Sequence, residues 1–216
     1  MAIVTKYLNE TLDPITEDEL LTYERYYEDI YIDGFLKKRT HLGNSRKGRY
    51  RITHYFLNDS EDINAILNEF CDLILNKRCI IYNNMQTNGN YTLWNWTEYS
   101  LEKVIKFKGK VVFDSNNRKL VLIYYDINTN SIKRAHKYFY ENIYEGELSD
   151  RLLGFSYFEN GELEYISDIK NRFDYIKPVD LTQFLADTKF SQVDFPWDQH
   201  TYYHNLYPLF PEGDTV

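Results

Sequence analysis

The chain has 216 residues, of which 43% are hydrophobic and 27% are charged, and its formal net charge at pH 7 is −8. This composition suffices for a packed core in one large domain, and no run of about 18 apolar residues is present that would form a membrane-spanning helix. Because a negative surface repels phosphate, general binding to nucleic acid or to anionic lipid is disfavoured.

Tyrosine and cysteine content narrow the class of protein further. The chain contains 21 Tyr, 13 Phe and 3 Trp. Since tyrosine is amphipathic, this excess favours half-buried sheet faces and contact surfaces. The two cysteines, Cys71 and Cys79, are too few for a disulfide framework in a chain of this size, so we interpret both as reduced core thiols. We therefore expect a cytoplasmic protein of a bacterium or a phage.

The first predicted elements are a short helix and two strands. Thr16 precedes an acidic turn, and Glu19 stands at the capping-box position, which predicts a short helix after residue 16. The segments 29–38, DIYIDGFLKK, and 49–57, RYRITHYFL, each predict a strand. We expect a basic loop around GNSRKG, residues 43–48, to join these strands.

The strongest helical signal covers residues 60–76, SEDINAILNEFCDLILN. Its apolar residues recur at helical spacing and form one stripe, with acids opposite it or in the first turn. The stripe comprises Ile63, Ile66, Leu67, Phe70, Leu73 and Ile74. We expect this segment to be the main core helix, lying on an antiparallel sheet, and two short strands, 79–82 and 90–96, to follow it.

From about Lys106 the apolar pattern changes to a period of two, which is typical of strands. Turn residues separate five segments of this kind: 110–114, 119–127, 131–140, 151–158 and 162–169. Segment 119–127 is apolar on both faces and should therefore lie centrally. Segment 162–169 should be an outer strand, with Leu163, Tyr165 and Ile169 on one face and acids on the other.

The C-terminal region completes the predicted fold. Asp180 should cap a short helix over residues 181–188, and the aromatic and proline-containing residues 190–216 should form an extended tail. No domain boundary is visible in the sequence. A helix and a sheet must each bury one face, so we predict a single α+β domain over residues 1–216: one long amphipathic helix plus short helices packed on a largely antiparallel, meander-rich β-sheet.

Two segments share a pattern of aromatic residues, an acid and an Asn-containing turn: residues 124–133, YYDINTNSIK, and residues 157–165, YFENGELEY. Locally this pattern resembles the tyrosine-and-turn units of bacterial MORN-like and YD-type repeat proteins, and some small bacterial antitoxins look similar. A repeat array keeps its period over at least three units, whereas here the spacing drifts and the glycine is missing from the first segment. We interpret both segments as hairpin corners of an ordinary meander.

His200 and His204 have the i, i+4 spacing that places two imidazoles on one helical face, near Asp198, as in zinc hydrolases. No glutamate follows the first histidine, and the neighbouring prolines and tyrosines disfavour a helix, so we expect tail-packing histidines and no metal. The sequence contains no Gly-x-Ser-x-Gly motif, and we identify no catalytic residue and no cofactor.

Residues 37–51, KKRTHLGNSRKGRYR, contain seven basic residues and no acid. A glycine-bounded loop of this kind can contact a phosphate through its backbone N–H groups, although the Walker spacing is missing. The candidate phosphate or nucleic-acid contacts are Lys37, Lys38, Arg39, Arg46, Lys47, Arg49 and Arg51. The alternative is a solvated hairpin tip, or a basic patch that the acidic N-terminal segment neutralises.

Removing these seven positive charges from the net charge of −8 leaves −15 for the rest of the chain. Acids accelerate the encounter with a cationic partner, and tyrosines supply contact area. We therefore expect a non-enzymatic protein that inhibits a basic protein partner, such as a toxin or nuclease, by occlusion, as immunity proteins, antitoxins or phage anti-defence proteins do. The expected acidic face comprises Glu17, Asp18, Glu24, Glu28, Asp29, Glu145, Glu147, Glu162 and Glu164. Two alternatives stay open: an enzyme whose site is assembled from distant residues, and a nucleic-acid or nucleotide binder that acts through residues 37–51.

Overall fold

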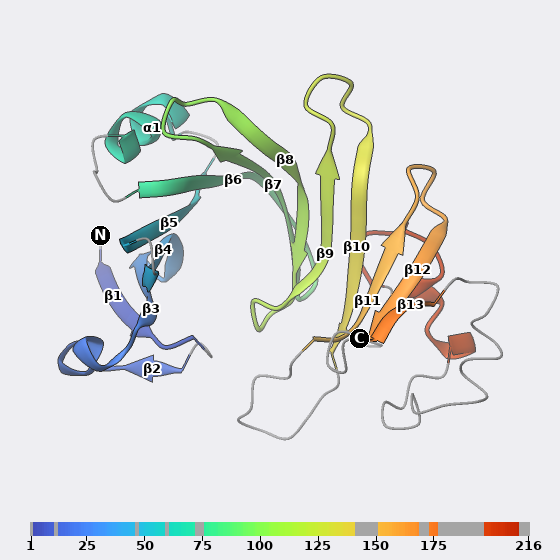
Figure 1. The fold of residues 1–216 in the computed structure, drawn as a ribbon, viewed down its shortest axis with the longest axis horizontal. Helices are drawn as coiled ribbons and strands as arrows, with labels where there is room; N and C mark the ends of the chain where they lie inside the picture. The colour runs from blue at the N-terminus through green and yellow to red at the C-terminus, as the bar shows by residue number, and fades with distance from the viewer. Residues whose placement is uncertain are drawn as a thin grey trace. The chain divides into compact units, whose positions relative to one another are not determined.

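The computed structural model describes residues 2–10, 13–45, 48–58, 61–71, 76–140, 151–168, 173–176 and 197–211. The chain divides into two compact units, unit 1 with Met1–Met85 and Trp94–Lys108, and unit 2 with Gln86–Leu93 and Gly109–Val216. Strands dominate the described residues (Figure 1).

Unit 1 is built on strands that pair mainly with their neighbours in sequence. Their hydrogen-bonded order is β7-β6-β5-β4-β3-β1-β2. The pairs β1–β2, β1–β3, β3–β4 and β4–β5 are antiparallel, whereas β5–β6 is parallel. Parallel strands need a crossover connection, and helix α1 lies in it. The bounds are β1 Ile3–Leu8, β2 Pro14–Ile15, β3 Arg25–Ile32, β4 Phe35–Ser45, β5 Gly48–Phe56, α1 Ile63–Cys71, β6 Asn76–Asn88 and β7 Tyr91–Tyr99.

Unit 2 contains the antiparallel meander that the period of two predicted. Its strands follow the order β8-β9-β10-β11-β12-β13, with β8 part of unit 2 only from Gly109 onward, so that each strand pairs with its neighbour in sequence. The bounds are β8 Ile105–Phe113, β9 Lys119–Tyr125, β10 Ile132–Tyr140, β11 Arg151–Tyr157, β12 Leu163–Asp168 and β13 Phe173–Ile176. The prediction of a central strand over 119–127 is confirmed, since β9 lies between β8 and β10 and Leu120, Val121 and Ile123 are fully buried.

The predicted fold class is wrong. No long helix packs on a sheet in the described part of the chain, where α1 covers only nine residues, Ile63–Cys71, in place of 60–76. Residue 76 already begins strand β6. The apolar stripe was read correctly where α1 exists, because Leu67 and Phe70 are buried against β5 and β6. None of the described helices is long and apolar enough to cross a membrane.

The interpretation of residues 29–38 as one strand is also wrong. Asp33 and Gly34 form a turn between β3 and β4, with φ angles of 49° and 86°. Asp-Gly is a favoured pair in tight hairpin turns because both central residues need a positive φ. The expected basic loop is therefore mostly the strands β4 and β5, and residues 46 and 47 lie outside the described range.

The face assignment of residues 162–169 needs correction as well. The register of β11 and β12 shifts between Ser156 and Tyr157, which interrupts the alternation of side chains. Ile166 is consequently the buried residue of β12, whereas Leu163 and Tyr165 are half-buried. Residue 169 lies outside the described part of the chain.

Three short 3-10 helices complete the described elements: η1 Glu17–Thr22, η4 Trp197–Gln199 and η5 Thr201–Tyr203. The first agrees with the predicted short helix, and the Thr16 N–H donates to the Glu19 carboxylate at 2.7 Å as the capping box requires. The predicted helix 181–188 falls outside the described residues.

The predicted C-terminal tail, 190–216, is described over residues 197–211. There it carries η4 and η5, and it buries Tyr203 and Leu206 completely in the core of unit 2. Asn205 forms a β-bridge with Glu162. This part of the tail is therefore an integral layer of unit 2.

Candidate functional site

A polar pocket of about 420 Å³ lies at the tips of two hairpins in unit 2. One hairpin joins β9 to β10 and the other joins β11 to β12, and both turns lie at the same end of the meander (Figure 1). The lining residues are Asp126, Thr129, Ser131, Ile132, Lys133, Tyr157, Phe158, Glu159 and Glu164. The pocket therefore joins residues about 30 positions apart in the sequence.

The β9–β10 turn is held by the carboxylate of Asp126. It accepts the backbone N–H groups of Asn128 and Thr129, each at 2.9 Å, while the N–H of Asp126 itself donates to the Ser131 carbonyl at 2.8 Å. These hydrogen bonds, that from Thr129 first, lower the pKa of Asp126. Asp126 is thus ionised at neutral pH and is fixed in place. Asn130 adopts a positive φ of 61°, which asparagine tolerates well in turns.

The β11–β12 turn is equally well defined. The Phe158 N–H donates to the Glu162 carbonyl, and the Gly161 N–H donates to the Phe158 carbonyl, both at 2.9 Å. Gly161 has a φ of 89°, a conformation that glycine reaches without strain. The Asn160 amide donates to the Glu162 carboxylate at 2.9 Å. Both rims of the pocket are therefore tight turns closed by their own hydrogen bonds.

The pocket has an acidic balance. Three carboxylates line it, from Asp126, Glu159 and Glu164, against the single cation of Lys133. Glu159 and Lys133 are exposed, and the other two side chains are half-buried. The pocket thus attracts positive charge, because fields of one sign add in a concave surface.

Large apolar side chains are exposed around the pocket. Phe158 is 49% exposed, Ile127 next to Asp126 is 41% exposed, and Tyr207 is 57% exposed. The ring of Tyr207 lies 3.7 Å from the position that a Cβ atom on Gly161 would occupy, which places it against the β11–β12 turn. We call Ile127, Phe158 and Tyr207 the apolar rim.

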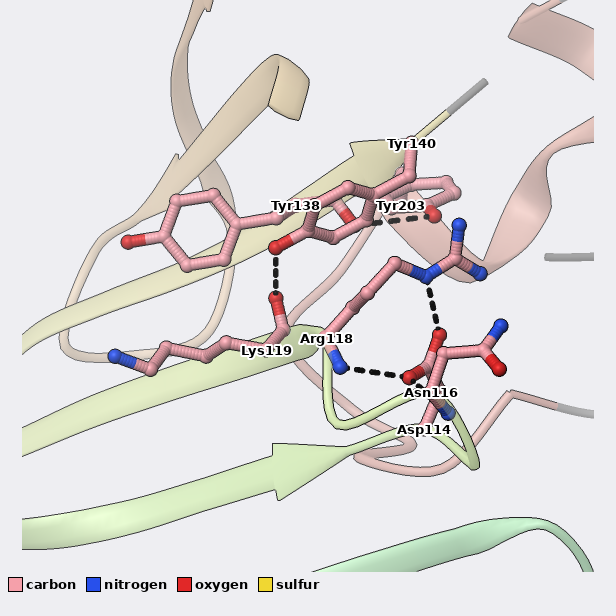
Figure 2. Close-up of polar contacts among 7 residues, drawn as sticks. All are labelled: Asp114, Asn116, Arg118, Lys119, Tyr138, Tyr140 and Tyr203. Carbon is pink, nitrogen blue, oxygen red and sulfur yellow. Dashed lines mark hydrogen bonds and ion pairs between the residues drawn. The ribbon is translucent and has the colours of Figure 1, made fainter. Parts of the chain in front are cut away.

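A second polar cluster closes the β8–β9 turn, as Figure 2 shows. The Asp114 carboxylate accepts the backbone N–H of Asn116 and of Arg118 and also the Arg118 Nε, the last at 2.6 Å. The Arg118 guanidinium lies 5.0 Å from the centre of the Tyr140 ring, and the Tyr140 hydroxyl donates to the Lys119 carbonyl at 2.9 Å. These contacts tie the turn to β10. The cluster therefore has a structural role.

A histidine and a serine come into contact across β10 and β11. The Nδ1 atom of His136 lies 2.8 Å from the Ser156 hydroxyl, which is the distance of a base from a nucleophile. Burial lowers the pKa of His136. Ser156 is only 4% exposed, however, so a substrate does not reach its hydroxyl in this arrangement. The half-buried His136 thus supplies the hydrogen-bond partner of the buried Ser156 hydroxyl.

His200 and His204 flank η5, and both pack against aromatic rings. The His204 ring stacks on Trp197 at 4.0 Å and its Nε2 lies 2.9 Å from the Trp197 carbonyl oxygen, while His200 meets Phe139 edge-on at 5.5 Å. Within the described ranges, no three His, Cys, Asp or Glu side chains are grouped so as to hold a metal ion.

The structure distributes the predicted acidic face over both units. Glu17, Asp18 and Glu24 are exposed and Glu28 is half-buried in unit 1, Glu162 and Glu164 lie at or beside the pocket in unit 2, and Glu145 and Glu147 fall outside the described residues. Asp29 is different, because its side chain is fully buried and accepts two hydrogen bonds from Arg39, at 2.7 and 2.8 Å. Asp29 is therefore not part of an exposed acidic face.

The basic segment 37–51 is partly neutralised by acids of the same unit. Lys37 pairs with Glu61 at 2.7 Å and Lys38 with Glu69 at 3.4 Å, in addition to the Arg39–Asp29 pair. Arg51 is half-buried, and the side chains of Arg46, Lys47 and Arg49 lie outside the described part of the structure. At least three of the seven cations thus already have carboxylate partners.

The two turns of the pocket are recognisable in the sequence as hairpin corners, but the pocket itself is not. Successive hairpins of a meander alternate between the two ends of the sheet, so the turns after β9 and β11 must share one end. That rule and the acids beside both turns, Asp126, Glu159 and Glu164, were the signal that would have predicted the site.

No family model matches the chain, and the searches of curated proteins and of solved structures found no match either. The function must accordingly be inferred from the pocket and its surroundings.

Proposed function

We propose that the protein is a non-enzymatic binding protein that inhibits a basic macromolecular partner by occlusion, in the manner of cytoplasmic immunity proteins, antitoxins or phage anti-defence proteins. The observation that carries this proposal is the acidic pocket of unit 2 with its apolar rim. A basic protein that carries out chemistry on nucleic acid is blocked when its cationic surface is covered.

Electrostatics supports a basic partner. The chain has a net charge of −8, and the pocket brings three carboxylates together with one lysine. Such a field accelerates the approach of a cationic surface and orients it on arrival. A lysine or arginine side chain of the partner fits the pocket, since it meets Glu159 and Glu164 with its charge and Phe158 with its aliphatic stem.

The apolar rim supports a contact surface of some affinity. Aromatic side chains supply large contact areas while few rotamers are frozen, and they are enriched among the residues that dominate binding energies. Phe158 and Tyr207 are more than 40% exposed next to well-ordered turns, so they can be covered without reorganisation of the backbone. The acids would then set the rate at which the partner associates, and the aromatic side chains would set the lifetime of the complex.

Nucleic-acid binding through residues 37–51 has less support. Lys37, Lys38 and Arg39 each pair with a carboxylate of the chain, so a phosphate would have to compete with existing ion pairs.

The test starts by capturing binding proteins on the tagged protein, with the untagged protein as competitor. The rate of association with the purified partner is then measured. The informative variant is Glu159→Gln with Glu164→Gln, which neutralises two pocket acids. Its control is Glu17→Gln with Asp18→Asn, which removes the same charge from unit 1. We expect the pocket variant to associate several-fold more slowly, the control to change little, and higher salt to slow wild type more than the pocket variant.

Three outcomes would contradict the proposal. The first is an acidic partner or an association rate that ignores salt. The second is equal behaviour of the two variants, which would show that the pocket is not the contact. The third is turnover of a small molecule by the purified protein, which would favour the enzyme alternative.

A further inference from the structure

Residues 197–211, which we call the C-terminal strap, cover one face of β10 and β11. Tyr203 of the strap packs against Phe155 at 4.5 Å and meets Phe139 edge-on at 6.0 Å. The Tyr157 hydroxyl donates to the Tyr203 carbonyl at 2.9 Å. The strap is thus bound to the sheet by its side chains and by its backbone.

Lys137 of β10 lies under the strap and is fully buried. Its Nζ donates to three backbone carbonyls of the strap, those of Tyr202 at 2.5 Å, Asn205 at 2.8 Å and Pro208 at 3.0 Å. The Nζ also lies 3.6 Å from the centre of the Tyr202 ring. A single side chain therefore connects three points of the strap to the sheet.

The chemistry of this contact is specific to a lysine. An ammonium group has three N–H donors and no acceptor, and three carbonyls satisfy all of them. No carboxylate of the described residues forms an ion pair with it, so carbonyl dipoles and the ring of Tyr202 replace water. Burial opposes the charge and lowers the pKa of Lys137 to about 7. An apolar residue would avoid this cost, which indicates that the position selects one arrangement of the strap.

The three acceptors surround the segment that carries the apolar rim. Asn205 and Pro208 flank Leu206 and Tyr207, and the Leu206 N–H donates to the Gly161 carbonyl at 2.9 Å. Leu206 is fully buried, whereas the adjacent Tyr207 is 57% exposed. The segment that carries Tyr207 is therefore hydrogen-bonded both to Lys137 and to the β11–β12 turn.

We propose that Lys137 is a latch that holds the C-terminal strap on the meander and thereby positions Tyr207 and the β11–β12 turn at the rim of the pocket. Lys137 is a positioning residue, because it touches the strap and not the pocket. The latch itself is independent of the proposed function, and only the use of the positioned rim for binding a partner rests on that function.

Hydrogen exchange on the full chain, read by mass spectrometry, tests the latch without any partner. The variant is Lys137→Met, which keeps the length of the side chain and removes all three donors. The control is Lys106→Met, which makes the same replacement at an exposed site in β8. We expect amides of residues 197–211 and of the β11–β12 turn to exchange at least about tenfold faster in Lys137→Met, with β9 and β10 protected as in wild type and no change in the control.

Unchanged exchange of the strap in Lys137→Met would overturn the proposal, and so would an equal loosening of strap and meander, because Lys137 would then be an ordinary core residue. If Lys137→Met does not fold, a second measurement, on wild type, still tests the proposal. Brief acetylation of wild type with an amine-reactive ester should modify exposed Lys133 and spare Lys137 in the same strand. Equal modification of the two lysines would refute the latch. Failure to find a basic partner would leave both results unaffected.

Discussion

Replacing Phe70 by alanine removes a fully buried aromatic side chain from the interface between α1 and the sheet of unit 1. Phe70 is fully buried and belongs to a cluster with Leu57, Leu67 and Ile81, none more than 4% exposed. Rigid strands line one side of this cluster, so the cavity can collapse only partly. We therefore expect the free energy of unfolding to fall by about 3–5 kcal/mol, the range for a buried phenylalanine. A helix of nine residues is unstable without its packing, which favours the upper half of that range.

Urea denaturation followed by tryptophan fluorescence measures this loss. In a Trp197→Phe background the remaining two tryptophans, Trp94 and Trp96, both lie in unit 1, so the signal reports the unit that contains α1. Phe35→Ala serves as the matched control, because Phe35 also lies in unit 1 but is 69% exposed, so its loss should cost under about 0.5 kcal/mol. A loss below about 1 kcal/mol for Phe70→Ala would mean that α1 does not bury this face, and the core of unit 1 as described would be refuted.

Three further changes test other contacts. Asp29→Ala should lower the free energy of unfolding by about 3 kcal/mol, since it leaves the Arg39 guanidinium without its carboxylate, whereas Glu10→Ala at an exposed pair should cost under about 1 kcal/mol in the same urea titration. Burial lowers the pKa of Lys137 from 10.5 to about 7, so the unfolded chain binds more protons between these values and stability should rise with pH above 7. Urea titrations at pH 7 and pH 9 should show this rise in the free energy of unfolding in wild type and a smaller rise in Lys137→Met. An equal rise in the two proteins would count against this prediction. Gly161→Ala should cost about 1 kcal/mol in thermal unfolding because its φ is 89°, and an unchanged midpoint would show that the turn relaxes.

The strands of unit 2 could be predicted because each of their signals is local. Alternating apolar residues and short polar turns such as 128–130 and 159–161 specify a meander without reference to distant residues. The face of β12 could not be assigned in the same way, because the register shift near Ser156 depends on the partner strand. Local pattern thus predicts which residues are strands better than which way their side chains point.

The helix was predicted to be longer than α1 for a related reason. In the sequence Leu73 and Ile74 continue the helical stripe of Phe70, but β6 already begins at Asn76, ahead of its apolar residues 79–82. Periodicity alone does not separate the end of a buried helix from the start of a buried strand. The Asp33–Gly34 turn, in contrast, was readable from the sequence, since Asp-Gly between alternating residues is a hairpin signal.

The pocket and the latch could not be predicted from local sequence patterns. Lys137 looks like one cation among several in KRAHK, residues 133–137, and only the pairing of β10 with the rest of unit 2 shows that it points into the core. A lysine in an apolar position of an alternating strand, between Ala135 and Phe139, is the signal that the sequence did contain. The acceptors of Lys137 are backbone carbonyls, which no pattern of residues predicts.

The distance in sequence between Lys137 and its acceptors has a consequence for folding during synthesis. The carbonyls of Tyr202, Asn205 and Pro208 lie 65, 68 and 71 residues downstream, whereas each strand of the meander can pair as soon as its neighbour has been made. When β10 and β11 leave the ribosome, the Lys137 amine and the rings of Phe139 and Phe155 are therefore not yet covered by the strap. Until residue 208 emerges, this face is available to chaperones or to another nascent chain, and the last contacts of unit 2 to form are those of highest contact order.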